Sequence, residues 1–396
     1  MAISQTITGS RPGGIHPAGW LAAALLGIGL LYLGQAISLT QAALFLVGGA
    51  LGVVLYHAAF GFTSAWRVFI TDARGRGLRA QMIMLAVAVT LFFPALDAGS
   101  ILGTSVSGFV APIGVAVVVG SFLFGVGMQL GGGCASGTLF TAGGGNVRMV
   151  ITLAGFILGS VIATHHVDWW WSQPAFDAVS LVSTFGLGGG LALSLALFAG
   201  IYGLTVAIEK RRHGALEKAP AGERAGWQRF LRGPWPLIWG AVGLAVLNFA
   251  TLALAGRPWG ITSAFALWGA KLFQFLGIDV GQWTYWQYAG NASALEGSIF
   301  ADVTSVMNVG IILGALAAAS LAGRFAPSLR IPFRPLLAAV IGGLLLGYGA
   351  RLAFGCNIGA YFSGIASGSL HGWAWLIFGF LGNMAGVRLR PWFFGR

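Results

Sequence analysis

The chain has 396 residues, of which 57% are hydrophobic and 8% are charged, with a mean hydropathy of +0.83 and a formal net charge of +12. Soluble domains usually carry about 25% charged residues, so this composition excludes a soluble globular protein and indicates an α-helical membrane protein. The two cysteines exclude a disulfide scaffold and a multi-cysteine metal cluster. We expect no cofactor, no metal, no catalytic residue and no nucleic-acid partner.

The predicted elements are transmembrane helices. About 20 apolar residues cross a bilayer, and the chain has ten stretches that approach this length. The predicted fold class is therefore an all-α, polytopic transmembrane protein with about nine or ten spans. Two shorter apolar stretches, 101–112 and 260–277, are predicted to be re-entrant or interfacial. In chain order the predicted spans are 18–38, 41–62, 80–97, 113–131, 148–167, 181–207, 235–256, 301–322, 336–354 and 372–388.

Basic residues predict the orientation of these spans. Seventeen of the 22 lysines and arginines fall in four segments, which all lie on one side if ten spans cross. Since positive loops stay in the cytoplasm, both termini are predicted to be cytoplasmic, in a multi-pass protein of the cell inner membrane. The segments are 67–79, 208–233, 323–334 and 388–396.

The two cysteines lie in similar local sequences. GVGMQLGGGCASGTLF begins at Gly125 and GYGARLAFGCNIGAYF begins at Gly347, at a constant offset of 222 residues. A weaker repeat relates GFTSAW at 61–66 to GITSAF at 260–265. The copies fall on spans predicted to run in opposite directions, which indicates inverted-topology repeats with a binding site at their interface.

The predicted organisation is a single integral membrane domain over 1–396. Repeat A covers about 41–167, a linker span and a basic cytoplasmic loop cover about 181–233, and repeat B covers about 235–388.

Each GCxxG segment predicts a helix that breaks at its cysteine and then restarts. The freed backbone N–H groups need partners at membrane depth, and the start of a helix favours an anion. Neutral thiols at Cys134 and Cys356 are soft, weak donors, so the pair favours a small anion with a terminal sulfur or selenium atom. The alternative is a duplicated packing motif without a ligand, since small residues are common at helix contacts. The glycines of the two motifs are Gly133, Gly137, Gly355 and Gly359.

Other polar residues inside the predicted spans are candidate functional residues, because polar groups are costly at membrane depth. Arg351 lies five residues before Cys356 and either attracts the anion or has a structural role, in which it snorkels or binds carbonyl groups. His371 is either a helix-end group or a proton-linked group. Asn357 directly follows Cys356 and completes the set of candidate path residues.

Together with NIGAYFSGIASGSLHGW at 357–373 and DVTSVMNVGIILGALAAASLAGRF at 302–325, these segments resemble the YeeE/YedE sulfur-transport family over about residues 45–388. The resemblance implies an integral membrane transporter that imports thiosulfate, or a related sulfur compound. It also implies that Cys134 and Cys356 line a narrow central path and pass the substrate along through hydrogen bonds of their thiols.

The chain departs from the family at one position. Some members have a third cysteine in a GFC-type segment, whereas this segment reads GFTSAW and has Thr63 or Ser64 in that place. A hydroxyl still donates a hydrogen bond but is harder than a thiol, so a three-cysteine relay is not expected. Because some relatives carry or accompany a small sulfur-carrier domain, we expect a cytoplasmic sulfur-carrier protein as a partner.

Alternative functions stay open at this point. The substrate can be another sulfur or selenium species, such as selenite, sulfite or sulfide. A membrane sulfurtransferase that forms a cysteine persulfide requires an activated thiolate, and no general base lies beside either cysteine in the sequence. A third class is a structural or partner-binding subunit without transport.

Overall fold

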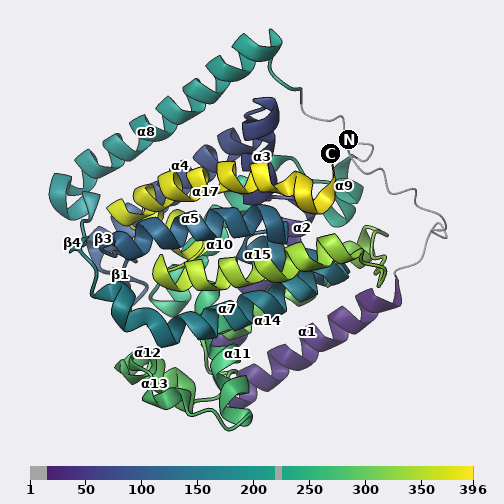
Figure 1. The fold of residues 1–396 in the computed structure, drawn as a ribbon, viewed down its shortest axis with the longest axis vertical. Helices are drawn as coiled ribbons and strands as arrows, with labels where there is room; N and C mark the ends of the chain where they lie inside the picture. The colour runs from purple at the N-terminus through teal and green to yellow at the C-terminus, as the bar shows by residue number, and fades with distance from the viewer. Residues whose placement is uncertain (1–15, 219–224, 396) are drawn as a thin grey trace.

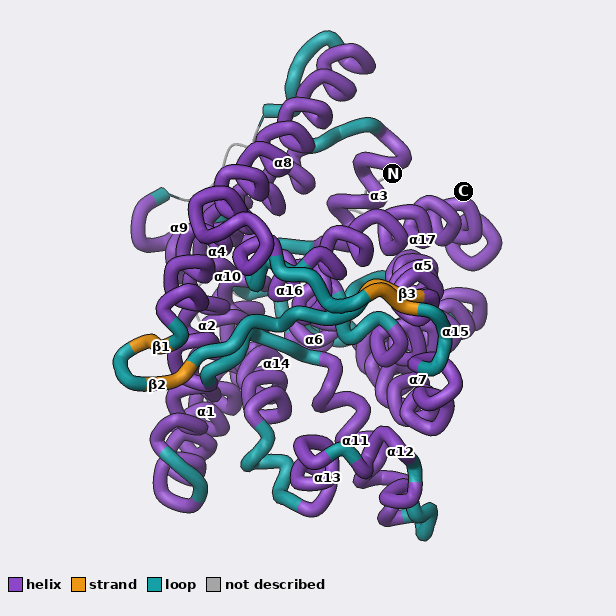
Figure 2. The backbone as a smooth tube through the Cα atoms, turned by 90° about the vertical axis from the view of Figure 1, so that its left-hand side faces the viewer, coloured by secondary structure: helices purple, strands orange, loops and turns teal. Residues whose placement is uncertain are grey.

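The structure, a computed structural model, describes residues 16–218 and 225–395 and is predominantly helical there (Figure 1). Strands in these residues are limited to two short antiparallel pairs, the hairpin β1–β2 and the pair β3–β4, whose strands are far apart in the sequence (Figure 2). Nine helical segments of the described chain are long and apolar enough to cross a membrane. The predicted all-α, polytopic membrane fold is therefore confirmed.

The described residues before the basic loop contain eight helices and four short strands. They are α1 Pro17–Ala36, α2 Leu39–Ala58, α3 Phe62–Asp72, α4 Arg76–Ala98, β1 Ser100–Ile101, β2 Thr104–Ser105, β3 Ile113–Gly114, α5 Val115–Gly131, α6 Ala135–Gly143, α7 Val147–Trp171, β4 Ala175–Phe176 and α8 Leu181–His213.

The described residues after this loop contain nine further α-helices and two short segments of other helix types. They are α9 Gly226–Arg232, α10 Leu237–Ala255, α11 Thr262–Phe275, η1 Val280–Gln282, α12 Thr284–Gln287, α13 Ala289–Glu296, α14 Val303–Leu321, α15 Phe333–Leu352, the π-helical η2 Asn357–Phe362, α16 Ser363–Ala366 and α17 Leu370–Phe394.

The tenth predicted span, 372–388, lies within α17, which is not among the nine segments. This helix has 25 residues, about 37 Å at 1.5 Å per residue, and is long enough to cross. Its hydropathy is lowered by His371, Asn383 and Arg388.

The two predicted re-entrant stretches have different structures. Most of 260–277 forms α11, which packs against α7, α14 and α15. By contrast, 101–112 contains part of the β1–β2 hairpin and an extended loop. A helix is therefore present at only one of the two positions.

The order of elements is repeated along the chain. The pair α2 and α3 of the first half corresponds to α10 and α11 of the second, and α4 corresponds to α14. The broken helix α5 and α6 corresponds to α15 with η2, and α7 corresponds to α17. The main contacts also come in matching pairs, since α5 packs against α17 as α15 packs against α7, and α4 packs against α10 as α14 packs against α2. Helices of the two halves are thus interleaved, while their opposite orientation in the membrane remains a prediction.

Glycine allows these helices to approach closely. A Cβ on Gly342 of α15 would overlap the backbone of Gly131 in α5, and a Cβ on Gly314 of α14 would overlap the carbonyl of Gly49 in α2. Since lipid removes most of the hydrophobic driving force between helices, such close backbone packing helps to hold a bundle together. The high glycine content is therefore used at the contacts between the two halves.

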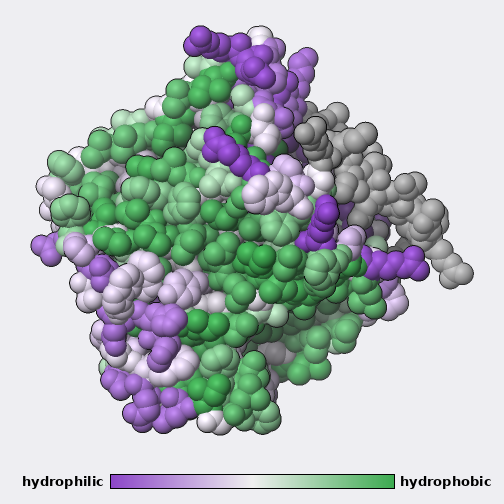
Figure 3. Space-filling model, in the orientation of Figure 1, coloured by the Kyte–Doolittle hydropathy of each residue, from purple (hydrophilic) through white to green (hydrophobic). Residues whose placement is uncertain are grey.

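The molecular surface carries a broad apolar band. In Figure 3 hydrophobic residues cover the middle of the visible face, and hydrophilic residues gather toward its top and its lower left. A contiguous apolar surface of this kind is what a bilayer covers.

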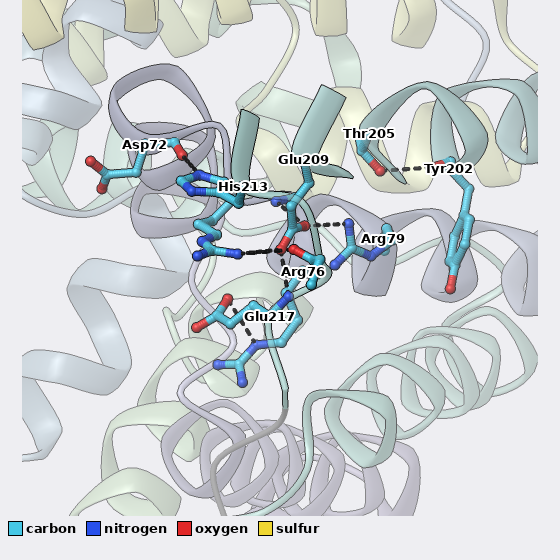
Figure 4. A network of polar contacts seen from close by, with 11 residues as sticks. Asp72, Arg76, Arg79, Tyr202, Thr205, Glu209, His213 and Glu217 are labelled. Carbon is cyan, nitrogen blue, oxygen red and sulfur yellow. Dashed lines mark hydrogen bonds and ion pairs between the residues drawn. The ribbon is translucent and has the colours of Figure 1, made fainter. Parts of the chain in front are cut away.

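The long helix α8 lies along the edge of the bundle and packs mainly on α4 (Figure 1). Its end is fixed by Glu209, whose fully buried carboxylate accepts hydrogen bonds from Arg74 at 3.2 Å and Arg79 at 2.7 Å. The same carboxylate accepts bonds from the N–H groups of Gly75 at 3.0 Å and Glu217 at 2.7 Å (Figure 4). Glu209 therefore ties α8 to the turn between α3 and α4.

We predict that Glu209→Gln lowers the midpoint of thermal unfolding measured in detergent. The change removes one partner of a buried ion pair, which typically costs about 3–5 kcal/mol. The matched control is Glu217→Gln, because Glu217 lies 3.8 Å from Arg76 and both side chains are about a third exposed, so the loss should stay within about 1 kcal/mol. Equal effects of the two changes would contradict this assignment.

Candidate functional site

Both GCxxG segments form a broken helix that restarts at the cysteine. After the end of α5, the sulfur of Cys134 accepts a hydrogen bond from the N–H of Gly137 at 3.4 Å and caps α6. After the end of α15, the sulfur of Cys356 accepts one from the N–H of Ile358 at 3.3 Å and caps η2. Each thiol thus satisfies an N–H group that the break leaves without a helical partner.

The glycine before each cysteine allows a close turn of the chain. A Cβ on Gly133 would lie 3.1 Å from the backbone nitrogen of Thr138, and a Cβ on Gly355 would lie 2.8 Å from that of Ala360. Gly355 also has a φ of +151°, where other residues are strained. Gly133 and Thr138 correspond to Gly355 and Ala360 at the 222-residue offset. The two turns therefore have the same close backbone contact.

The two cysteines are free, buried and close to each other in the fold. Cys134 is 1% exposed and Cys356 is 0% exposed, and both belong to the same buried cluster. The segments that they cap, α6 and η2, are in contact, and the two thiols lie within range of electrostatic interaction. The structure therefore brings together the two residues that the repeat singled out.

Several buried polar atoms around the breaks lack a hydrogen-bond partner among the described residues. They include both amide atoms of Asn357, the hydroxyl of Tyr361 and the hydroxyl of Thr63. The ring of Tyr361 contacts that of Phe62, which precedes Thr63 on α3, at a centroid distance of 6.0 Å. An unsatisfied buried polar group typically costs about 1–3 kcal/mol. This cluster of unpartnered atoms therefore indicates a binding site for a polar ligand or for water.

The two hydroxyls predicted at the third position of the path differ in burial. Thr63 is 4% exposed, whereas Ser64 is exposed and donates a hydrogen bond to the carbonyl of Gly61 at 3.1 Å. Only Thr63 lies in the interior. Its repeat counterpart, Thr262, is also buried.

A cavity of about 290 Å³ lies against the second break. Gly355, Gly359 and Ser363 contribute to its wall from the broken helix, and Arg351 and Arg257 contribute cationic side chains. A small oxyanion fits a cavity of this size.

Arg351 is the buried cation of this cavity. It is 8% exposed and donates hydrogen bonds to the hydroxyl of Tyr285 at 2.6 Å and that of Thr262 at 2.8 Å. Its Nε has no partner, and no carboxylate of the described residues lies within 4.0 Å of its guanidinium. A buried cation without a counter-charge is costly, so the cavity favours an anion.

His371 lies at the start of α17, beside this cavity. Its Nδ1 is 2.6 Å from the hydroxyl of Ser369, and its buried Nε2 has no hydrogen-bond partner in the described chain. Its ring contacts that of Phe109, which lines the cavity, at a centroid distance of 5.3 Å.

Sequence reasoning missed four residues of this region: Thr262, Tyr285, Tyr361 and Arg257. Thr262 was available from the weak repeat, because it stands in GITSAF where Thr63 stands in GFTSAW. Nothing in the local sequence of the other three indicates their position.

Comparison with known proteins gives a consistent set of relatives. A family model described as Sulphur transport matches residues 57–385. The thiosulfate transporter TsuA of Spirochaeta thermophila is 30% identical across 85% of this chain and 95% of its own length. TsuA of Escherichia coli is 25% identical across 85% of this chain and 90% of its own length. The probable transporter YedE of Escherichia coli is 34% identical over 168 residues, and this chain spans only 40% of its length.

The cavity predicts a specific effect of Arg351→Gln. In the unmodified protein, thiosulfate at about 100 times its dissociation constant should add about 2.7 kcal/mol to stability, measured as a rise in the thermal midpoint. We expect Arg351→Gln to lose most of this rise, and the exposed Arg330→Gln to keep it. A full rise in Arg351→Gln would contradict an anion site at Arg351.

Proposed function

This chain belongs to the Sulphur transport family, and we propose on that basis that it imports thiosulfate, or a closely related sulfur anion, through a path lined by Cys134 and Cys356. Two of its relatives are named thiosulfate transporters. The observation that carries the proposal is the pair of buried, free cysteines that cap two broken helices, with unpartnered polar atoms around them.

The proposed path begins at the cavity beside Arg351. The unbalanced guanidinium draws in the dianion, and His371 and Thr262 add polar groups near it. Asn357, which follows Cys356, then offers amide hydrogens to the oxyanion oxygens. The glycines of the two motifs leave room for the anion beside the backbone.

The cysteines then handle the sulfur end of the substrate. A neutral thiol donates a weak hydrogen bond and does not repel a dianion, whereas a thiolate would. The proposed step from Cys356 to Cys134 therefore breaks and forms hydrogen bonds and no covalent bond. Thr63 supplies a hydroxyl donor where some relatives have a third cysteine, while the exposed Ser64 stays outside the path.

A sulfurtransferase activity has less support. The sulfur of Cys134 is hydrogen-bonded to the N–H of Gly137 and the hydroxyl of Ser136, and the sulfur of Cys356 to the N–H of Ile358. In the described chain neither sulfur is thus paired with a histidine, lysine or carboxylate that could activate it.

The membrane placement follows from the same proposal. We place the chain in the cell inner membrane with both termini in the cytoplasm, the two halves in opposite orientation, and a sulfur-carrier protein as the cytoplasmic acceptor. Moving a dianion inward against about 100 mV costs about 4.6 kcal/mol. Uptake therefore needs either a coupled ion or rapid consumption of the substrate inside.

We predict that Cys134→Ala and Cys356→Ala each strongly lower the uptake of labelled thiosulfate into cells that lack their own importer. Each change removes the soft donor at one step of the path, so the loss should exceed about tenfold, as for a hydrogen bond to a charged ligand. Ser64→Ala is the matched control and should transport normally, because Ser64 is exposed. Normal uptake by both cysteine variants, at matched membrane expression, would refute the proposed path.

A further inference from the structure

Three arginines from different helices gather beside the first break. Arg390 of α17 donates a hydrogen bond to the carbonyl of Gln129 near the end of α5, at 2.6 Å. Its guanidinium lies 4.4 Å from the ring centroid of Phe394, and that of Arg148 lies 5.4 Å from the same centroid. Phe394 thus holds two cations on one ring.

Arg148 also touches the break itself. Its guanidinium covers Gly132, the residue between α5 and Gly133, where a Cβ would overlap it. Arg67 comes from α3, which packs beside both α17 and α5, and interacts electrostatically with Arg148 and Arg390. The cluster therefore contacts the first break at Gly132, two residues before Cys134 in the sequence.

The charge of this cluster is not balanced by protein. No carboxylate of the described residues lies within 4.0 Å of the three guanidinium groups. Arg148 has a buried Nη1 without a hydrogen-bond partner. Three like charges that repel one another in a partly buried place favour an anion between them.

The duplication does not account for these arginines. The short repeat relates Arg67 to Ala266. When α7 and α17 are aligned on their cap residues, Asn146 and Ser369, Arg148 corresponds to His371 and Arg390 to Val167. None of the three corresponding positions holds an arginine. The first break therefore has its own set of cations, while the second break has Arg351 in the position of Gln129.

We propose that Arg67, Arg148 and Arg390 form a second anion site, which receives the sulfur oxyanion after it passes Cys134 and before it enters the cytoplasm. Planar guanidinium groups bind tetrahedral oxyanions through paired hydrogen bonds. A site on each side of the cysteines lets the anion enter and leave in steps. Conduction needs binding that is strong enough for entry and weak enough for release, which several successive sites provide. This inference rests on the proposed transport function and its orientation.

The test compares the two faces of the membrane. Half-saturating thiosulfate concentrations are measured for uptake into right-side-out and inside-out membrane vesicles that contain the protein. Arg148→Gln with Arg390→Gln should raise the value about tenfold in inside-out vesicles and leave it within about twofold in right-side-out vesicles. Arg351→Gln should show the reverse pattern. Arg330→Gln with Arg334→Gln is the matched control, because both residues are exposed, and should change neither value.

The outcomes separate this site from the transport function. No uptake by the unmodified protein in either preparation would overturn the function and the site together. Uptake whose half-saturating values are unchanged by the variants, or raised equally on both faces, would overturn only the site. If the double variant does not insert, Arg67→Gln and Arg148→Gln as single changes carry the same expectation. An effect that vanishes in liposomes without anionic lipid would assign the arginines to a lipid phosphate and overturn the proposal.

Discussion

A broken helix inside a membrane leaves N–H groups that need a partner, and the rest of this structure depends on how that need is met. Cys134 and Cys356 meet part of it through their own sulfur atoms, which accept from Gly137 and Ile358. Because the cap is a thiol, the first turn of each restarted helix presents a neutral, polarisable group in the protein interior. The neighbouring Asn357, Thr63 and Tyr361 keep polar atoms without partners, so the interior is suited to a small polar guest.

The interleaving of the two halves determines where these breaks meet. Glycines such as Gly342 and Gly314 let helices from opposite halves approach at backbone distance. As a result, α6 and η2 come into contact, although their cysteines are 222 residues apart. The charge distribution does not follow the repeat: Arg351 lies beside the second break, whereas Arg67, Arg148 and Arg390 lie beside the first. The surroundings of the two breaks therefore differ in their cationic side chains.

Sequence patterns predicted the membrane fold well, because each span is a local run of apolar residues. They also singled out both cysteines, because the repeat is a short sequence motif that recurs at a fixed offset. They did not separate Thr63 from Ser64, since burial depends on how α3 packs in the bundle rather than on the residue type. Tyr361 and Arg390 were missed for the same reason, because their positions beside the breaks depend on contacts with helices far away in the chain.

The measurement that tests the central claim most directly is X-ray diffraction at the selenium edge from crystals soaked in selenosulfate, in which selenium replaces the terminal sulfur. The account predicts an anomalous peak in contact with the sulfur of Cys134 or Cys356, and its loss at the position where that cysteine is changed to alanine. A peak elsewhere, with none near either cysteine in a protein that transports selenosulfate, would contradict the claim that these thiols line the path.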